Sequence, residues 1–410
     1  MPLNVLVSAY ACGPNWGSEI GMGWNWVINL AQYCQLTVIT EKGFKNDIEA
    51  VLPNLDLKFQ PKFHFIDIGE KARRRFWNQG DWRFYSDYCR WQWQAYQLVE
   101  TLIKAEKFDL IHQLNMIGYR EPGYLWKLPL PLIWGPIGGH AQMPWAFIPA
   151  MGWKDGLQHT LRNTLNAIQM RASVRVKKAI QKARVLIAAT GEDQRTIKHV
   201  HQRDAILINE TGTYPHEMQR THLPWEKNRP LKLVWCGKFV ARKILPVGLR
   251  AIAQVCHEMS IELHIVGSGN LDSEWKELAK KLNIEKNCHW HGHCPHEQAL
   301  EIMQNSDALL FTSIQEATST VVMEALQFGL PVICHNTCGF GAVINQNSGI
   351  KIPVVSPTYS INAFAKALIE IGHNPTILDQ LSQGAIRRAE ELSWNNKVKI
   401  MHDLYQKILA

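Results

Sequence analysis

The stretch Asp307–Cys334, DALLFTSIQEATSTVVMEALQFGLPVIC, contains a strand, a helix and a second strand in succession. The apolar run Ala308–Thr312 is typical of a buried strand. Gly329-Leu-Pro331 ends the helical part and leads into the strand Pro331–Cys334. A strand–helix–strand unit of this length places parallel strands in one sheet, with the helix packed on a face of that sheet. The stretch therefore predicts an α/β fold.

The same alternation of β-branched strands and helical stretches extends over the whole chain. Its predicted strands fall into two series. The first series is Leu3–Tyr10, Gln35–Thr40, Phe63–Ile68, Phe108–Gln113, Pro131–Ile137, Arg184–Ala189 and Ala205–Asn209, and the second is Lys232–Gly237, Glu262–Val266, Cys288–His291, Ala308–Thr312, Pro331–Cys334 and Gly349–Ile352. This is more than one ordinary sheet holds. We therefore expect two Rossmann-like, doubly wound domains, residues 1–210 and 211–390, facing a central cleft, with a terminal helix over 391–410.

Composition narrows the class of protein. The chain has 410 residues, of which 46% are hydrophobic and 20% charged, as in folded proteins. No apolar run is long enough for a transmembrane helix, and the first residues lack the basic start of a secretory signal. The nine cysteines are an odd number without a CxxC pair. These features favour a cytoplasmic protein with reduced thiols.

Positive charge is concentrated in the first half. Residues 1–210 hold 25 Lys and Arg against 18 Asp and Glu, whereas residues 211–410 hold 19 against 18. Residues 156–191 contain no acidic residue and carry a helical apolar stripe beside basic side chains. The stripe is Leu161, Leu165, Ile168, Ala172, Val176, Ala179 and Ala183, and the basic residues are Arg171, Arg175, Lys178 and Lys182. This pattern fits a helix on an anionic membrane surface, and it fits a helix packed on its own sheet equally well. No basic recognition helix or zinc-finger spacing points to nucleic acid.

The loop and helix after Phe311 predict an anion site. Glu316 lies in the loop, and Glu324 lies about two turns into the following helix, so they can contact two parts of one ligand. The helix begins near Thr318, Ser319 and Thr320. Backbone N–H groups at a helix N-terminus, together with the helix dipole, favour a phosphate or diphosphate.

Two glutamates separated by seven residues and followed by EALxxGxPVI resemble the nucleotide-sugar site of family 4 retaining glycosyltransferases, which have the GT-B architecture. Gly237–Lys243 resembles the basic loop of that family, and Val266–Gly269 resembles its glycine turn. Ser393-Trp394 and the helix after it resemble the segment that crosses back to the first domain. The similarity covers essentially the whole chain.

The resemblance implies a role for each matching residue. Glu324 would bind the donor ribose, and Glu316 the transferred sugar. Lys238 and Lys243 would stabilise charge on the leaving diphosphate, with Gly267 and Gly269 in the donor-binding turn. Lys238 stands where arginine is common, and Ala317 and Ser319 stand where glycines are frequent. The chain has no Asp-x-Asp, so no metal or other cofactor is expected.

Three further residues of the first domain are candidates. Gly17 lies in the loop ACGPNWGSEIGMGW, which resembles a donor-facing Gly-Ser-Glu loop found in a bacterial polysaccharide-assembling branch of the family. The alternative is that this loop is only a structural tight turn. His140 follows the strand at 131–137, and His112 ends the strand at 108–113. Either histidine could lie at the reacting centre or be a structural residue.

A dense run of potential metal ligands, CHWHGHCPH over 288–296, suggests zinc. On a strand His289, His291 and His293 point one way and Cys288 the other. Because the run also occupies the place of an ordinary strand and turn of the family, we predict no metal there.

Together these features predict a retaining hexosyltransferase. It would move a hexose-type sugar from a nucleotide-diphosphate donor to a glycan or lipid-linked acceptor in cell-envelope polysaccharide synthesis. The expected location is cytoplasmic, including peripheral attachment to the inner face of the plasma membrane. The alternatives are a nucleotide-sugar epimerase on the same fold and a non-catalytic glycan- or nucleotide-binding protein.

Overall fold

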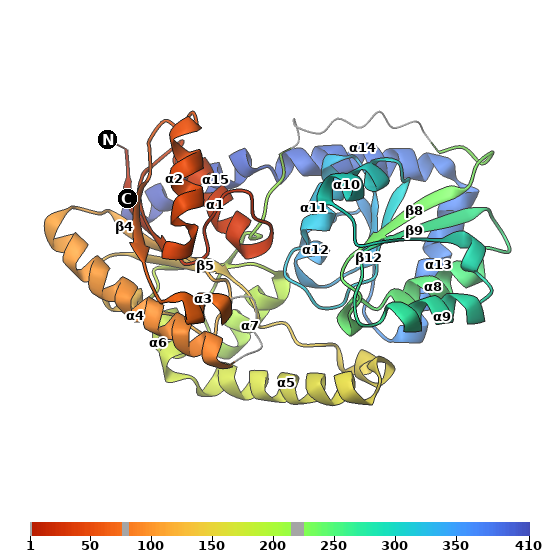
Figure 1. The fold of residues 1–410 in the computed structure, drawn as a ribbon, viewed down its shortest axis with the longest axis horizontal. Helices are drawn as coiled ribbons and strands as arrows, with labels where there is room; N and C mark the ends of the chain where they lie inside the picture. Colours follow the sequence, from red (N-terminus) through yellow and green to blue (C-terminus); the bar gives the residue numbers. More distant parts are fainter. Residues whose placement is uncertain (1, 76–81, 215–224) are drawn as a thin grey trace. The chain divides into compact units, whose positions relative to one another are not determined.

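The computed structural model describes residues 2–75, 82–214 and 225–410 (Figure 1). The chain forms two compact units. The first comprises Met1–His140, Ala167–Glu210 and Trp394–Ala410, and the second comprises Ala141–Asn166 and Thr211–Ser393. Each unit is built on one parallel sheet.

The sheet of the first unit has the strand order β3-β2-β1-β4-β5-β6-β7 among the described residues. Its central strands are buried on both faces, as their apolar, β-branched sequences predict. The strands are β1 (Asn4–Ala9), β2 (Gln35–Glu41), β3 (Lys62–Ile66), β4 (Leu110–Asn115), β5 (Leu132–Ile137), β6 (Val185–Ala188) and β7 (Ile206–Leu207).

Helices alternate with these strands. The α-helices are α1 (Ser18–Leu30), α2 (Lys45–Val51), α3 (Glu70–Arg75), α4 (Trp82–Ala105), α6 (Val174–Lys182), α7 (Gly191–His201) and α15 (Trp394–Leu409), with 3-10 turns η1 (Lys42–Phe44), η2 (Leu52–Asn54) and η3 (Leu125–Lys127). The terminal helix α15 packs on α1, where the rings of Trp26 and Trp394 meet edge to face with centroids 5.4 Å apart. Lys397 also donates a hydrogen bond to the carbonyl of Asn209. The last helix thus belongs to the first unit.

The sheet of the second unit has the order β10-β9-β8-β11-β12-β13. Its strands are β8 (Leu231–Cys236), β9 (Ile261–Val266), β10 (Cys288–Gly292), β11 (Ala308–Phe311), β12 (Val332–His335) and β13 (Gly349–Ile352). Its α-helices are α8 (Leu245–Val255), α9 (Asp272–Lys281), α10 (His296–Gln304), α11 (Thr320–Gln327), α12 (Cys338–Val343), α13 (Pro357–His373) and α14 (Pro375–Glu391), with 3-10 helices η4 (Trp145–Met151), η5 (Ala241–Lys243) and η6 (Glu285–Asn287).

Two apolar cores cover the two faces of this second sheet. Successive residues of β8 alternate between them: Leu233 belongs to one core and Val234 to the other. Figure 1 shows α8, α9 and α13 on one face and α10, α11 and α12 on the other. This doubly wound arrangement confirms the predicted fold class, with two Rossmann-like domains.

One segment groups differently from the predicted boundaries at 210 and 390. Residues Ala141–Asn166 lie in the second unit, although they precede the last strands of the first. The reason is apolar packing: Met143, Phe147 and Ile148 join the core of the second sheet, and the ring of Phe147 meets His335 edge to face. The helix α5 (Trp153–Ala172) begins in the second unit and ends in the first.

Two further features concern the whole described chain. All nine cysteines lie within it as free thiols. Within residues 2–75, 82–214 and 225–410, no helix combines the length and the apolar character needed to cross a bilayer. Residues 215–224, which follow the predicted domain boundary at 210, lie outside the described residues.

Candidate functional site

The loop between β11 and α11 forms the centre of the site in the second unit. Ser319 has extended backbone angles at the N-cap position of α11, where its side chain makes no capping hydrogen bond. The first intrahelical bonds are donated by Val322 and Met323 to the carbonyl of Ser319. Thr318 and Ser319 are buried, whereas Thr320 is exposed. The helix therefore presents its positive end and its first-turn N–H groups beside Glu316.

Glu316 is held by three neighbours. Its Oε1 atom forms an ion pair with Lys243 and lies 3.3 Å from Arg242. Ser313 donates a hydrogen bond of 2.8 Å to the same oxygen. The structure thus brings Glu316 and Lys243 together, from segments 73 residues apart in the sequence, because β8 and β11 are neighbours in the sheet.

Lys243 is a buried cation. Its side chain is 8% exposed, and its Nζ atom lies 4.8 Å from the centroid of the Phe311 ring. Burial lowers the pKa of this ammonium group, and the Glu316 carboxylate acts in the opposite direction. A cation and helix N-terminus in such a poorly hydrated place interact strongly with an anionic ligand.

Two glycine turns lie against each other at the ends of β8 and β9. Gly267 has a φ of +131°, and a Cβ atom there would lie 1.9 Å from the carbonyl oxygen of Gly237. A Cβ atom at Gly269 would lie within 3 Å of the backbone of Phe239. Both positions therefore need glycine for close backbone approach. Lys238, in the same turn, is exposed.

Glu324 has a partner that sequence reasoning missed. Its Oε1 atom lies 2.9 Å from Nε2 of His296, the first residue of α10. The hydrogen bond to Glu324 raises the pKa of His296. The sequence signal was present, because His296 ends the histidine-rich run, but that run was considered only as a metal site. The pair gives the carboxylate of Glu324 a fixed direction beside α11.

His140 lies in the first unit as part of a buried pair with Asp193. Its Nδ1 atom and its backbone nitrogen lie 2.9 and 3.0 Å from Oδ1 of Asp193. Thr190 donates to the other oxygen of that carboxylate, and Tyr119 stacks on the imidazole with ring centroids 4.2 Å apart. A carboxylate held in this way fixes the ring orientation of His140, which suits a group that must be placed accurately.

His112 is placed differently. It is fully buried, and its ring nitrogens contact the hydroxyl of Tyr405 at 2.6 Å and the carbonyl of Gly135 at 2.7 Å. Burial lowers its pKa to about 4. Both ring nitrogens thus have partners within the first unit. We interpret His112 as a structural residue of β4 that connects this strand to α15 and β5. The contact with Asp193 instead orients the ring of His140.

Gly17 is the N-cap residue of α1, and Glu19 lies in the first turn of that helix. A Cβ atom at Gly17 would meet nothing within 4 Å, whereas one at Gly21 or Gly23 would strike backbone oxygens at about 2 Å. Glu19, which sequence reasoning passed over, accepts a hydrogen bond from the backbone N–H of Ile117. Burial raises its pKa to about 7, the Ile117 hydrogen bond opposes this, and Glu210 adds to the rise. The first turn of α1 thus carries the carboxyl group of Glu19, whose pKa lies near neutrality.

The pKa of Glu19 predicts a pH-dependent stability. The folded chain holds this proton up to about pH 7, whereas a glutamate in the unfolded chain releases it near its ordinary value of 4.5. The stability associated with the proton is therefore present below pH 4.5 and lost as the pH rises through 7. Glu19→Gln has no proton to lose at this position. The free energy of unfolding of the variant, relative to that of wild type, should therefore rise by about 3 kcal/mol between pH 5 and pH 8. Thermal unfolding at both pH values measures this. The exposed Glu49→Gln variant is the control, and a gain for Glu19→Gln that does not change with pH would contradict the assignment.

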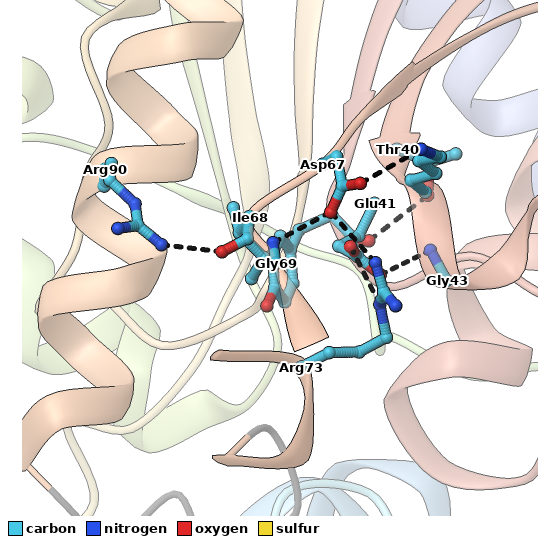
Figure 2. Close-up of polar contacts among 10 residues, drawn as sticks. Thr40, Glu41, Gly43, Asp67, Ile68, Gly69, Arg73 and Arg90 are labelled. Atoms are coloured by element: carbon cyan, nitrogen blue, oxygen red, sulfur yellow. Dashed lines mark hydrogen bonds and ion pairs between the residues drawn. The ribbon is translucent and has the colours of Figure 1, made fainter. Parts of the chain in front are cut away.

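A polar cluster lies at the carboxyl ends of β2 and β3 (Figure 2). Figure 2 shows Arg73 of α3 directed at Glu41, whose two carboxylate oxygens each lie 3.2 Å from the Arg73 Nε atom. Arg73 also contacts Asp67 at 3.0 Å, and Gly43 donates to Glu41. The charge of Arg73 is thus balanced by two carboxylates. We interpret the cluster as structural, because it connects β2, β3 and α3.

Comparisons with known proteins agree with this geometry. Residues 219–388 match the family described as "Glycosyl transferases group 1". The lipopolysaccharide glucosyltransferase WaaG of Escherichia coli is 29% identical over 29% of this chain and 32% of its own. The chain spans about a quarter to about half of the length of the curated relatives that it matches.

Solved structures match over nearly the whole chain. Sucrose-phosphate synthase from Thermosynechococcus elongatus superposes with a TM-score of 0.64 at 16% identity, covering 99% of both chains. The Anabaena protein HepE in complex with UDP gives a TM-score of 0.60 at 13% identity, covering 99% of this chain and 100% of that one. These likenesses establish the GT-B fold. The chain therefore has the GT-B fold, and its residues 219–388 are similar to the group 1 glycosyltransferases.

Proposed function

We propose that the chain is a retaining glycosyltransferase that uses a nucleotide-diphosphate hexose as its donor. The buried contact of Lys243 with Glu316 carries this proposal. It joins a buried cation to a carboxylate of the loop that precedes α11, with Arg242 beside them. Glu324, one turn into α11, would bind the ribose. HepE, which has the same fold, has been solved in complex with UDP and with UDP-glucose.

The proposed reaction is an internal return. The bond between the sugar C1 and the diphosphate oxygen breaks, and a bond from C1 to the acceptor oxygen forms on the same face. The acceptor proton passes to an oxygen of the leaving phosphate. Lys243 stabilises the negative charge that develops on the diphosphate, and Glu316 orients the sugar.

We propose a glycan or lipid-linked acceptor of the cell envelope. The support is the similarity to a lipopolysaccharide glucosyltransferase and the excess of positive charge in residues 1–210. His140, held by Asp193, is the candidate for contact with the reacting groups.

Calorimetry with UDP, GDP and ADP tests the donor site. We expect one of the three to bind, UDP being the first choice, and Glu324→Gln to weaken that binding tenfold or more through loss of a charged hydrogen bond. Glu297→Gln, an exposed acid on the first turn of α10, is the matched control. Binding of none of the three by folded protein would favour the non-catalytic alternative. Consumption of a nucleotide sugar without any acceptor would favour the epimerase.

The predicted amphipathic segment consists of two helices with different environments. On α6, Val176, Ala179 and Ala183 lie against the first unit and are buried. On α5 the stripe is exposed. Its predicted members Leu161 (58% exposed), Leu165 (55%) and Ile168 (57%) are preceded at helical spacing by the exposed Trp153 (77%) and Leu157 (65%). Packing on its own sheet thus applies to α6, and the exposed stripe of α5 supports our proposal of contact with an anionic membrane surface.

Vesicle binding tests this proposal. The stripe of α5 is flanked by Lys154, Arg162 and Arg171, all exposed. Basic side chains beside an exposed apolar face favour anionic lipid surfaces. We expect the chain to co-sediment with phosphatidylglycerol-containing vesicles, and the double change Leu161→Gln and Leu165→Gln to lower the partition coefficient by about tenfold or more. The matched control is Ile400→Gln on α15, where Ile400 is 52% exposed. Equal binding of all three proteins would contradict the proposal.

A further inference from the structure

Two neighbouring strands of the second unit carry four metal-ligand side chains on one face. Glu262 and His264 lie on β9, and His289 and His291 lie on the edge strand β10. Residues two apart on a strand share a face. The register pairs His289 with His264, so the two pairs lie side by side. These side chains face away from the core that contains Leu263 and Ile265.

Three of the four converge on one point. The Nε2 atom of His264 lies 3.6 Å from Oε2 of Glu262, and the Nε2 atom of His289 lies 4.0 Å from that same oxygen. One ligand atom from each of the three residues lies within 4.8 Å of the other two. Ligand atoms around a tetrahedral zinc ion are about 3.3 Å apart, which follows from bond lengths of about 2.0–2.1 Å. Small side-chain rotations would therefore bring the three atoms to coordinating distance.

His291 fixes the ring of His264. The Nδ1 atom of His264 lies 3.1 Å from Nε2 of His291, while Nε2 of His264 is buried without a hydrogen-bond partner among the described residues. If Nδ1 of His264 carries the hydrogen and donates it to His291, Nε2 presents its lone pair beside Glu262. This is the arrangement of a metal-binding histidine oriented by a second polar group.

The surroundings give an ion access. Glu262 and His289 have side chains that are 28% and 43% exposed. A neighbouring pocket of about 290 Å³ separates the strands from α10. It is lined by His264, His291, Lys232, Gln298, Glu301, Ile302, Asn305 and Ser306. Lys232, which pairs in register with Glu262, is a positive charge on this side, and Glu301 is a negative one.

We propose that Glu262, His264 and His289 bind a divalent late first-row metal ion of the zinc type, with His291 orienting His264. Two imidazoles and a carboxylate are a ligand set that zinc accepts, with water in the remaining position. The ion would fasten the edge strand β10 to β9. The site is separate from the Lys243–Glu316 centre and does not depend on the proposed glycosyl transfer.

Metal titration of the chain without a histidine tag tests the proposal. After treatment with a chelator, the protein is titrated with Co²⁺, followed by its visible absorption, and then with Zn²⁺ in competition with a coloured chelator. We expect one ion per chain. His264→Gln, His289→Gln and Glu262→Gln should each weaken binding tenfold or more. His293→Gln, in the same segment but outside the three ligands, should bind as wild type does.

A second readout is thermal unfolding. Zinc at about one hundred times its dissociation constant should raise the Tm of the wild type by roughly 5 °C or more, and it should not raise the Tm of His289→Gln. Several results would overturn the proposal: no binding below millimolar metal, equal binding by all the variants, or a thiolate-to-cobalt charge-transfer band, which would place the ion on cysteines.

Discussion

Lys243→Met should lower kcat/KM for glycosyl transfer by about 100-fold to 1000-fold. The side chain of Lys243 is buried, and its Nζ atom forms an ion pair with Glu316 and lies 4.8 Å from the centroid of the Phe311 ring. A preorganised charge in such a site stabilises developing negative charge far better than an exposed one does, and removing one such group usually has this effect. Steady-state release of the nucleoside diphosphate measures it.

Two comparisons isolate the role of the charge. Lys276→Met, on the exposed surface of α9, should keep wild-type kinetics. Glu316→Gln should lower activity as well, and the double variant should lose less than the two single losses combined, because the side chains form one contact. Wild-type activity of a folded Lys243→Met protein would remove Lys243 from the mechanism.

Gly267→Ala should destabilise the second unit by about 4 kcal/mol. The Cβ atom would lie 1.9 Å from the carbonyl oxygen of Gly237, on a residue whose φ is +131°. Backbone strain and steric overlap each cost about 1–3 kcal/mol. The turn also donates the hydrogen bond from Gly267 to the carbonyl of Gly292, so a backbone shift would disturb β10 as well. Thermal unfolding should show a fall in Tm of roughly 10 °C.

Gly17→Ala is the matched control for that change. Gly17 has a φ of −84°, and a Cβ atom there would meet nothing within 4 Å. Its stability should equal that of wild type to within about 0.5 kcal/mol. If both glycine variants have the Tm of wild type, the turn after β9 can relax to accept a Cβ atom. In that case close backbone approach does not explain the glycine at position 267.

The sequence predicted the fold class because alternation of strands and helices is a local property. The predicted runs at 3–10, 35–40 and 308–312 coincide with β1, β2 and β11. The donor motif was also local, since Glu316, Thr318 and Glu324 lie on one loop and the helix that follows it. The group 1 glycosyltransferase match over residues 219–388 covers that motif.

Contacts between distant segments could not be predicted in this way. Sequence reasoning left His112 and His140 as equal candidates, because a ring's partners come from other elements: Tyr405 of α15 for the first and Asp193 of α7 for the second. Sequence reasoning likewise considered the histidines of 288–296 as metal ligands without knowing that side chains of β9 lie beside them. The pairing of β9 with β10 brings Glu262 and His264 next to these histidines. The spacing of residues within one segment cannot predict which strand will be its neighbour.

The sequence by itself thus determined the two-sheet α/β architecture, and it predicted a donor site in the loop before α11, because periodicity and helix-start signals act within a few residues. Only the tertiary structure decided that Lys243 is buried against Glu316, that Ala141–Asn166 joins the second unit, and that α5 leaves its apolar stripe exposed. Burial and charge pairing depend on which elements meet in space, and that is set by the packing of the whole chain.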